Sequence, residues 1–315
     1  MLLDLRQDQP FLSWHRNMKA SAAKKNMTQA LSLGSRPITR KNLPKLGLRD
    51  FDGWFTATQG VTTVSDVVSE WDNLVPGGAN LTQSTANARP ALTTVNGKTA
   101  IDFDGASGRG AASDFVTEGA MLDDIGTGDF YVGMVINCDS MPLSNQTLVT
   151  KANGTSNSQW TFSIQSDSAG DDEVGVQLQH VQTSPTITAT TLFTTSEILF
   201  VDKTTFIELV KTGDTLKVFS NGTLVETASA QSKDFTANGD MKISNQGGST
   251  PFNGVLCEFI CKKGAMPDKT RQIIESLMAE KWNLNSARAT SKRGRASGFN
   301  SLSTDNKFRN RVPRF

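Results

Sequence analysis

The chain has 315 residues, of which 37% are hydrophobic and 20% are charged. This length accommodates one β domain of roughly 200 to 250 residues with a substantial core, together with extensions. No run of about 18 apolar residues occurs, which argues against a membrane-spanning helix and a membrane partner. Asp4 and Arg6 interrupt the apolar start, which argues against a secretory signal.

Charge is distributed very unevenly along the chain, although the formal net charge is only +1. Residues 1–50 hold ten Lys or Arg against three Asp or Glu, and residues 286–315 hold eight against one, so each end carries +7. The middle, residues 51–285, therefore carries −13. We divide the chain into a basic N-terminal arm, an acidic body and a basic C-terminal strap.

The N-terminal arm, residues 1–50, has two parts. Residues 14–33 are rich in Ala, Met and Lys, which predicts a short helix that Gly34 and Pro37 end. The segment that follows, residues 34–50, contains two prolines and is predicted to be extended. Its candidate contacts with a partner are Arg36, Arg40, Lys41 and Lys45.

The body consists of short segments rich in β-branched and aromatic residues, separated by Gly, Asn, Asp and Ser. Many short strands at close spacing predict an all-β sandwich or barrel. Asn221 and Gly222 favour a tight type I′ hairpin, because both tolerate positive φ. The predicted strands are 98–105, 130–137, 160–166, 173–179, 205–212, 215–220, 223–229, 241–244 and 254–261.

The three cysteines are Cys138, Cys257 and Cys261. On a strand, a four-residue spacing separates Cα atoms by about 13 Å, well beyond the ~7 Å limit for a disulfide. We therefore predict free, buried thiols and a reducing compartment.

One helix is predicted within the body, over residues 267–282. Pro267 suits the first turn, and the segment ends in Lys281 and Trp282. Its apolar residues fall on one face, which we expect to pack on the sandwich. They are Ile273, Ile274, Leu277 and Met278.

The C-terminal strap, residues 286–315, combines Gly, Ser and Arg with regularly spaced Phe, and has too little apolar surface for a core. Two interpretations stay open: a disordered solubilising tail, or a strap that orders against a partner, with each Phe filling a pocket. The candidate partner contacts are Arg293, Arg295, Phe299, Phe308, Arg309 and Phe315.

Two motifs stand at the ends of the body. The opening motif comprises Trp71, Asp72, Gly77, Gly78, Gln83, Arg89, Pro90, Phe103, Asp104 and Gly105, and the closing motif comprises Gly254, Glu258, Lys281 and Trp282. These motifs resemble those of concanavalin A-like (laminin-G-like) jelly-roll domains, which are common in bacteriophage structural proteins and bacterial surface proteins. The resemblance covers residues 51–285 and implies a jelly-roll sandwich with a closing helix. It says little about activity, because the same sandwich carries lectins, glycanases, adhesion modules and virion parts.

Two acid pairs are candidates for catalysis: Glu70 with Asp72, and Asp102 with Asp104. Glycanases that share the resembled fold carry a Glu-x-Asp-x-(x)-Glu strand, in which two carboxyl groups about 5 Å apart act as acid and nucleophile. Neither pair has the third carboxylate. We interpret both as structural, with Asp72 capping the turn over residues 73–78, and predict that the protein is not an enzyme.

Two acidic loops are candidate calcium ligands, although neither has EF-hand spacing. His15 and His180 are too far apart in sequence to suggest zinc or a catalytic triad. The glycine-rich segment 105–110 lacks the Lys-Ser/Thr of a phosphate-binding loop. Clustered loop carboxylates are more often simply solvated, so we predict no cofactor. Calcium stays open as the alternative, at Asp123, Asp124 and Asp129 or at Asp167, Asp171, Asp172 and Glu173.

These features together predict a non-enzymatic virion structural protein, specifically a capsid decoration or cement protein that its arms anchor to the major capsid protein or another virion protein. We expect multiple copies or a homo-oligomer, assembled in the host cytoplasm. Nucleic acid is disfavoured because the acidic body repels it.

The alternative is a carbohydrate-binding, receptor-recognising module of a phage head or tail fibre. In that case Trp160 and Tyr131 are the candidates for stacking on sugar rings, and both fit equally well as core residues. A glycanase is the least favoured interpretation.

Overall fold

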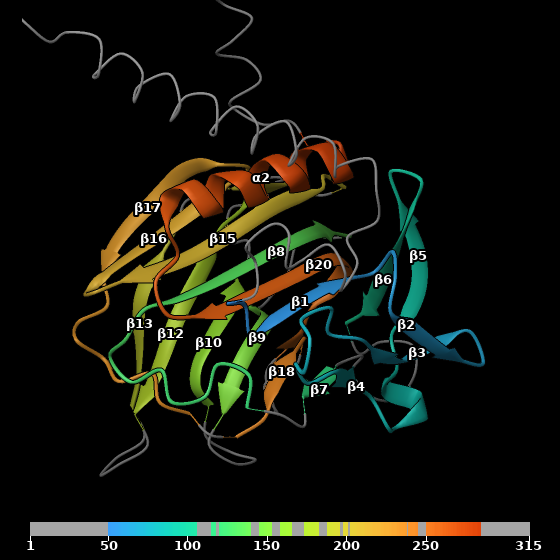
Figure 1. The fold of residues 1–315 in the computed structure, drawn as a ribbon, viewed down its shortest axis with the longest axis horizontal. Helices are drawn as coiled ribbons and strands as arrows, with labels where there is room; N and C mark the ends of the chain where they lie inside the picture. The colour runs from blue at the N-terminus through green and yellow to red at the C-terminus, as the bar shows by residue number, and fades with distance from the viewer. Residues whose placement is uncertain are drawn as a thin grey trace, which may run out of the picture.

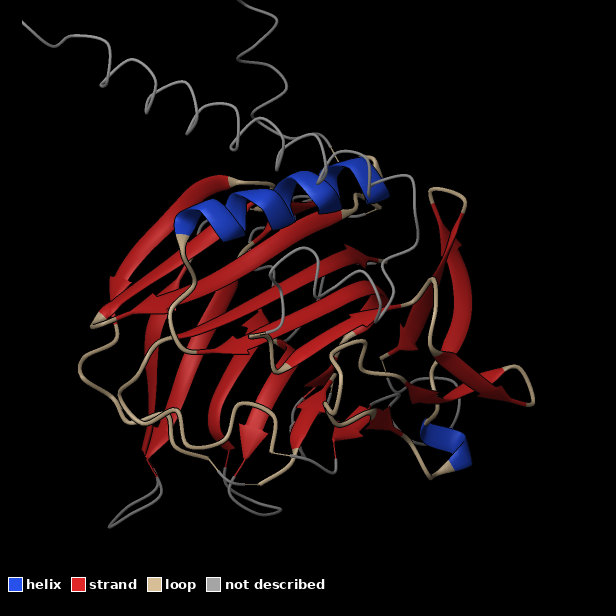
Figure 2. Ribbon diagram, in the orientation of Figure 1, coloured by secondary structure: helices blue, strands red, loops and turns tan. Residues whose placement is uncertain are grey.

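The computed structural model describes residues 50–105, 115–117, 120–139, 145–152, 158–165, 173–182, 188–195, 198–200, 202–237, 239–244 and 250–284. These residues form two mainly antiparallel β-sheets that face each other, with one helix against the outside of the first (Figure 1). The predicted all-β sandwich with a C-terminal packing helix is confirmed. Strands dominate the secondary structure (Figure 2).

The first sheet is built around β8 and β20, its longest strands. One side of β20 pairs with β8, and its other side pairs with β6 near its start and with β1 near its end. In spatial order the strands are β17 (Thr223–Ser229), β16 (Thr215–Ser220), β15 (Thr205–Thr212), β8 (Phe130–Cys138) and β20 (Asn253–Lys263), then β1 (Gly53–Thr56) and β6 (Lys98–Asp104), with β5 (Ala91–Val95) outside β6.

The second sheet contains more but shorter strands. In spatial order they are β13 (Thr188–Thr194), β12 (Val176–Gln182), β10 (Ser158–Ile164), β9 (Gln146–Ala152), β18 (Met241–Ile243), β7 (Phe115–Thr117), β4 (Leu81–Thr82), β3 (Val67–Trp71) and β2 (Val61–Val64).

The two sheets meet at one corner, where Val67 of β3 pairs with Ala91 of β5. Smaller pairings complete the described structure: β19 (Thr250–Pro251) runs parallel to β9, and β11 (Glu173–Val174) pairs with β14 (Leu199–Phe200). A single turn of 3-10 helix, η2, spans Ala86–Ala88.

Alternation along the strands places one apolar core between the sheets. In the second sheet, Val149, Phe162 and Leu178 lie in one cross-strand row and are fully buried. They face apolar residues of the first sheet, such as Met134 and Ile136. Because side chains alternate with period two, the residues between them point away from this core.

A second apolar cluster lies on the outside of the first sheet, beneath helix α2 (Asp268–Trp282). The helix runs along the outside of this sheet, in about the direction of β15 (Figure 1). It begins after Pro267 and ends where Asn283 adopts φ 54° and donates its N–H to the Ala279 carbonyl. Ile274, Leu277 and the other residues of its buried face pack on the sheet, as the stripe in the sequence predicts. No helix among the described residues is long and apolar enough to cross a membrane.

The three cysteines are buried free thiols, as predicted. A β-bulge in β20 between Leu256 and Glu258 shifts the alternation, so Cys257 faces the helix while Cys261 faces the core between the sheets. Burial raises the pKa of Cys138 to about 12. These thiols are therefore packing residues.

Candidate functional site

The outward face of the second sheet carries a row of polar side chains, which we call the outer row. Each member pairs directly with the next across neighbouring strands, except that Val116 of β7 pairs with both Thr82 and Lys242 and interrupts the row, so all lie on one face. The apolar neighbours of these residues in sequence, such as Trp160 and Phe162 beside Thr161, point into the core. In spatial order the outer row comprises Thr62, Glu70, Thr82, Lys242, Thr150, Thr161, Gln179 and Thr191, with β7 crossing between Thr82 and Lys242.

Exposure varies along the outer row. Thr191 is exposed at one end, and Gln179 and Lys242 are half-buried. Thr150 and Thr161 in the centre are buried and share a hydrogen bond of 3.1 Å between their hydroxyl oxygens. The centre is thus fixed by its own contacts, while Gln179, Thr191 and Lys242 on either side of it are at least partly exposed.

Glu70 and Asp72, the first candidate acid pair, are held by a single amide. Asn80 Nδ2 donates to Glu70 Oε1 at 2.6 Å and to Asp72 Oδ1 at 3.0 Å. Asn80 Oδ1 accepts from the backbone N–H of Asn73 at 2.9 Å. The pair therefore fastens the joint between β3 and the following turn, which supports the structural interpretation.

The expectation that Asp72 caps the turn over residues 73–78 is wrong. Asn73, not Asp72, accepts the turn N–H of Val75 at 3.0 Å, and the same oxygen accepts the N–H of Trp54 at 3.1 Å. Asn73 Nδ2 donates to the Asp52 carbonyl at 2.9 Å. An amide side chain can both donate and accept, so it ties the turn after β3 to the segment at residues 52–54, whereas an ionised carboxylate can only accept.

The remaining residues of the opening motif also hold the fold. Trp71 and Phe103 are fully buried in the core. Arg89 Nε donates to the Gln83 carbonyl at 2.9 Å, and the Pro90 carbonyl accepts the Val68 N–H at 2.8 Å. Asp104 ends β6, opposite Asn253, and Gly105 follows with φ +60°.

The closing motif is one hydrogen-bonded unit. Glu258 of β20 is fully buried, and its Oε1 contacts Lys281 Nζ and accepts from Trp282 Nε1 at 3.1 Å. The Lys-Trp end of α2 is thereby fastened to the first sheet. This explains physically why the motif contains a strand Glu and a helical Lys-Trp.

Trp160 and Tyr131 do not face solvent, so of the two interpretations the core position is confirmed and stacking on sugar rings is wrong. Both are 0% exposed. Trp160 stacks on Phe130 inside the sandwich, with ring centroids 5.8 Å apart. Tyr131 lies under α2, where its hydroxyl donates to Glu208 Oε1 at 2.9 Å.

A buried ionic cluster surrounds Glu208 beneath α2. Arg271 NH1 lies 3.4 Å from Glu208 Oε2, contacts Glu275 Oε1, and stacks over Phe219 with its guanidinium carbon 3.6 Å from the ring centroid. Burial, reinforced by the charge of Glu275, raises the pKa of Glu208 well above its usual range. One guanidinium serves two carboxyl groups here, so the cluster favours a proton on Glu208.

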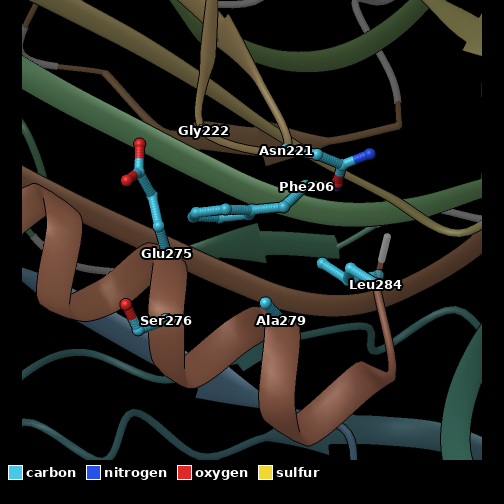
Figure 3. Close-up of a pocket in the computed structure, with 7 residues that line it drawn as sticks. All are labelled: Phe206, Asn221, Gly222, Glu275, Ser276, Ala279 and Leu284. Carbon is cyan, nitrogen blue, oxygen red and sulfur yellow. The ribbon is translucent and has the colours of Figure 1, made fainter. Parts of the chain in front are cut away.

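A pocket of about 40 Å³ adjoins this cluster, between α2 and the β16–β17 turn (Figure 3). At roughly 10 to 15 Å³ for each water, it has room for about three water molecules, far less than an ordinary ligand site. It is therefore not a site for a sugar ring. Its lining residues are Phe206, Asn221, Gly222, Glu275, Ser276, Ala279 and Leu284.

The structure also describes the first candidate calcium loop, which holds Asp123, Asp124 and Asp129. Asp123 forms an ion pair with Lys151, a fully buried lysine of β9. Asp129 Oδ1 accepts the Gly213 N–H at 2.7 Å, and Asp124 is exposed. Among the described residues, no three His, Cys, Asp or Glu side chains gather as metal ligands.

Other predicted site residues can be placed only in part. His180 is buried, with Nε2 2.8 Å from the Asp234 carbonyl, and burial lowers its pKa. Asp102 pairs in register with Val255 of β20 and Ala91 of β5. Outside the described residues lie His15, Asp167, Asp171, Asp172 and the arm contacts Arg36, Arg40, Lys41, Lys45, Arg293, Arg295, Phe299, Phe308, Arg309 and Phe315, and the side chain of Glu173 is likewise not described.

Sequence reasoning missed the outer row and the buried lysines. The alternation in "WTFSI" already separates Thr161 and Ser163 from the apolar face, so the polar face of the second sheet could have been predicted. A single Lys in the apolar strand "FIELVKT" marks Lys211 as buried and paired.

Comparisons with solved structures identify similar folds. The botulinum neurotoxin serotype D binding domain matches with a TM-score of 0.50 and 10% identity, over 72% of this chain and 51% of that one. The binding domain of Paraclostridial Mosquitocidal Protein 1 gives 0.50 and 9%, over 73% and 52%. The botulinum neurotoxin DC binding domain in complex with rat synaptotagmin II gives 0.50 and 11%, over 72% and 52%.

No family model matches the sequence, and a comparison with curated proteins finds no match. The match spans about half the length of the solved binding domains. None of these three is a phage protein, so the predicted phage association stays a prediction. At about 10% identity, what the comparisons establish is that this chain shares a β-sandwich fold with these binding domains.

Proposed function

We propose that the sandwich is a non-catalytic binding domain that recognises carbohydrate on a receptor. The outer row carries this proposal. Its hydroxyl, amide and ammonium groups donate and accept hydrogen bonds, which is the chemistry that a hydroxyl-rich sugar requires. The likeness of the fold to toxin binding domains, one of them solved in complex with rat synaptotagmin II, supports a binding function.

The candidate acids already interact with other side chains of the protein, which favours a binding function over catalysis. Glu70 and Asp72 share one amide, and Glu258 is buried against Lys281 and Trp282. A general acid or nucleophile needs access to substrate, and a glycosidase needs two such carboxyl groups facing each other across it. The described residues offer no such pair in a pocket large enough for a sugar.

A glycan array probed with the full chain, with and without calcium, tests the proposal. We expect saturable binding that falls at least tenfold in Gln179→Ala and Thr191→Ala, because each removes a polar group from the accessible part of the outer row. Thr227→Ala is the matched control, since Thr227 is also an exposed threonine but lies on β17 of the first sheet. Failure to bind any glycan, or equal binding by all three variants, contradicts the proposal.

The distribution of charge favours a second candidate, in which the protein is a virion decoration protein tied to a shell by its arms. Two +7 extensions flank a −13 body, a pattern suited to bridging neighbouring copies or an acidic shell face. Deleting residues 1–49 or 286–315 should leave a folded sandwich that no longer joins particles. Normal incorporation of both truncations contradicts this candidate.

A further inference from the structure

The loop over residues 120–129 leads into β8, and its carbonyl groups accept hydrogen bonds from several segments of the chain. Backbone N–H groups satisfy three of the five carbonyls from residue 125 to residue 129. Gly128 donates to Ile125, Phe235 to Gly126, and Gly264 to Asp129. Thr127 and Gly128 are exposed residues, and their carbonyls accept from a lysine side chain instead of a backbone N–H.

Lys211 supplies that donor from the end of β15. Its Nζ donates to the carbonyl oxygens of Thr127 at 2.6 Å, Gly128 at 3.0 Å and Gly213 at 2.7 Å. An ammonium group has three N–H bonds, and all three are used. The residue is 1% exposed.

The surroundings of Lys211 are those of a bound cation. The carboxylates of Asp129 and Asp214 favour its charge, and the Phe235 ring centroid lies 5.7 Å from Nζ. Burial nevertheless lowers the pKa of Lys211, so the oxygens around it are needed to keep the charge.

A second buried lysine occupies the other acidic part of the same loop. Lys151 comes from β9 of the second sheet and pairs with Asp123. Two of the three carboxylates in "DDIGTGD" thus already interact with a cation or a backbone donor of the chain itself.

We propose that the loop at 120–129 and the turn at residues 213–214 form a cation site that the chain fills itself, with the ammonium of Lys211 standing where a metal ion would bind. Three oxygens at 2.6 to 3.0 Å match the length of N–H···O hydrogen bonds. Calcium instead takes six to eight oxygens at 2.3 to 2.6 Å. The loop therefore takes no calcium while Lys211 is present, and takes a small amine or a metal ion once the side chain is removed.

Thermal unfolding of the full chain tests this inference. Lys211→Ala deletes three carbons and the ammonium group, a volume that propylammonium can refill. Lys217→Ala is the matched control, because Lys217 is half-buried on the adjacent strand β16. Tetramethylammonium, a cation without N–H groups, controls for charge alone.

We expect the melting temperature of the unaltered chain to be the same in calcium and in chelator. Lys211→Ala should melt about 5 to 10 °C below Lys217→Ala. Propylammonium should raise the melting temperature of Lys211→Ala saturably and leave that of Lys217→Ala unchanged, and tetramethylammonium should raise neither. A rise in melting temperature on adding calcium that is seen for Lys211→Ala and not for the other proteins also supports the site.

Equal melting of the two variants, or calcium stabilisation of the unaltered chain that Asp129→Asn abolishes, overturns the inference. If Lys211→Ala yields no folded protein, nitrogen-15 NMR of the lysine side chains tests instead whether the Lys211 ammonium is held in the proposed site. A slowly exchanging ammonium signal in the unaltered chain that is missing in Lys211→Arg supports the site. Absence of any protected ammonium signal overturns it.

Discussion

Replacing Lys281 by Met tests the closing motif most sharply. Glu258 is 0% exposed and has Lys281 as its cation, while the Lys281 side chain is 12% exposed. Methionine preserves much of the side-chain volume but leaves a carboxylate buried without a counterion. Breaking a buried ion pair from one side costs about 3 to 5 kcal/mol, and the slight exposure of Lys281 places the expected loss in the free energy of unfolding near 3 kcal/mol.

Urea unfolding of the full chain, followed by tryptophan fluorescence, measures this loss, and Lys217→Met is the control. A loss near 3 kcal/mol corresponds to a fall in melting temperature of about 6 to 12 °C for a sandwich of this size. The double variant Glu258→Gln with Lys281→Met should be more stable than Lys281→Met alone, because the unpaired charge is then removed. A Lys281→Met variant within about 0.5 kcal/mol of the control would refute the reasoning.

Three further predictions concern other buried groups. The pKa of Glu208 is raised in the folded state. Glu208 therefore contributes its full share of stability below the unfolded pKa of about 4.3, and this share is lost as the pH rises through the folded pKa. The urea midpoint of Glu208→Gln should consequently depend less on pH than that of the unaltered chain. Asn73→Ala should lower the free energy of unfolding by about 2 to 3 kcal/mol in the same assay, because it leaves buried backbone groups without a hydrogen-bond partner. A loss below about 0.5 kcal/mol would contradict the inference that Asn73 holds this turn in place. Cys138, Cys257 and Cys261 should react with a thiol reagent only as fast as the chain unfolds, and rapid labelling of the folded protein would show that a thiol is accessible.

The fold could be predicted from the sequence because its patterns are local. The stripe that includes Ile274 and Leu277 identifies the packed face of α2. Asn221 and Gly222 identify the hairpin, and both adopt the positive φ that the turn requires. Such features need no knowledge of which elements meet in space.

The site could not be predicted to the same extent, because it depends on which layer each strand face meets. Alternation places Tyr131 and Trp160 on definite faces of their strands, but it does not reveal that α2 covers one face and the opposite sheet covers the other. The bulge in β20 likewise reverses the alternation after Cys257 without a recognisable pattern in the sequence. Lys211 finds its partners 84 and 83 residues away, at Thr127 and Gly128.

The central claim is that carbohydrate binds to the outer row of the second sheet. Backbone NMR of the full chain, titrated with a glycan that the array selects, tests it most directly. The account predicts saturable shifts at Gln179, Thr191 and Lys242 and none at Thr227 of the first sheet. Shifts confined to the first sheet, or no shifts with any glycan, would contradict it.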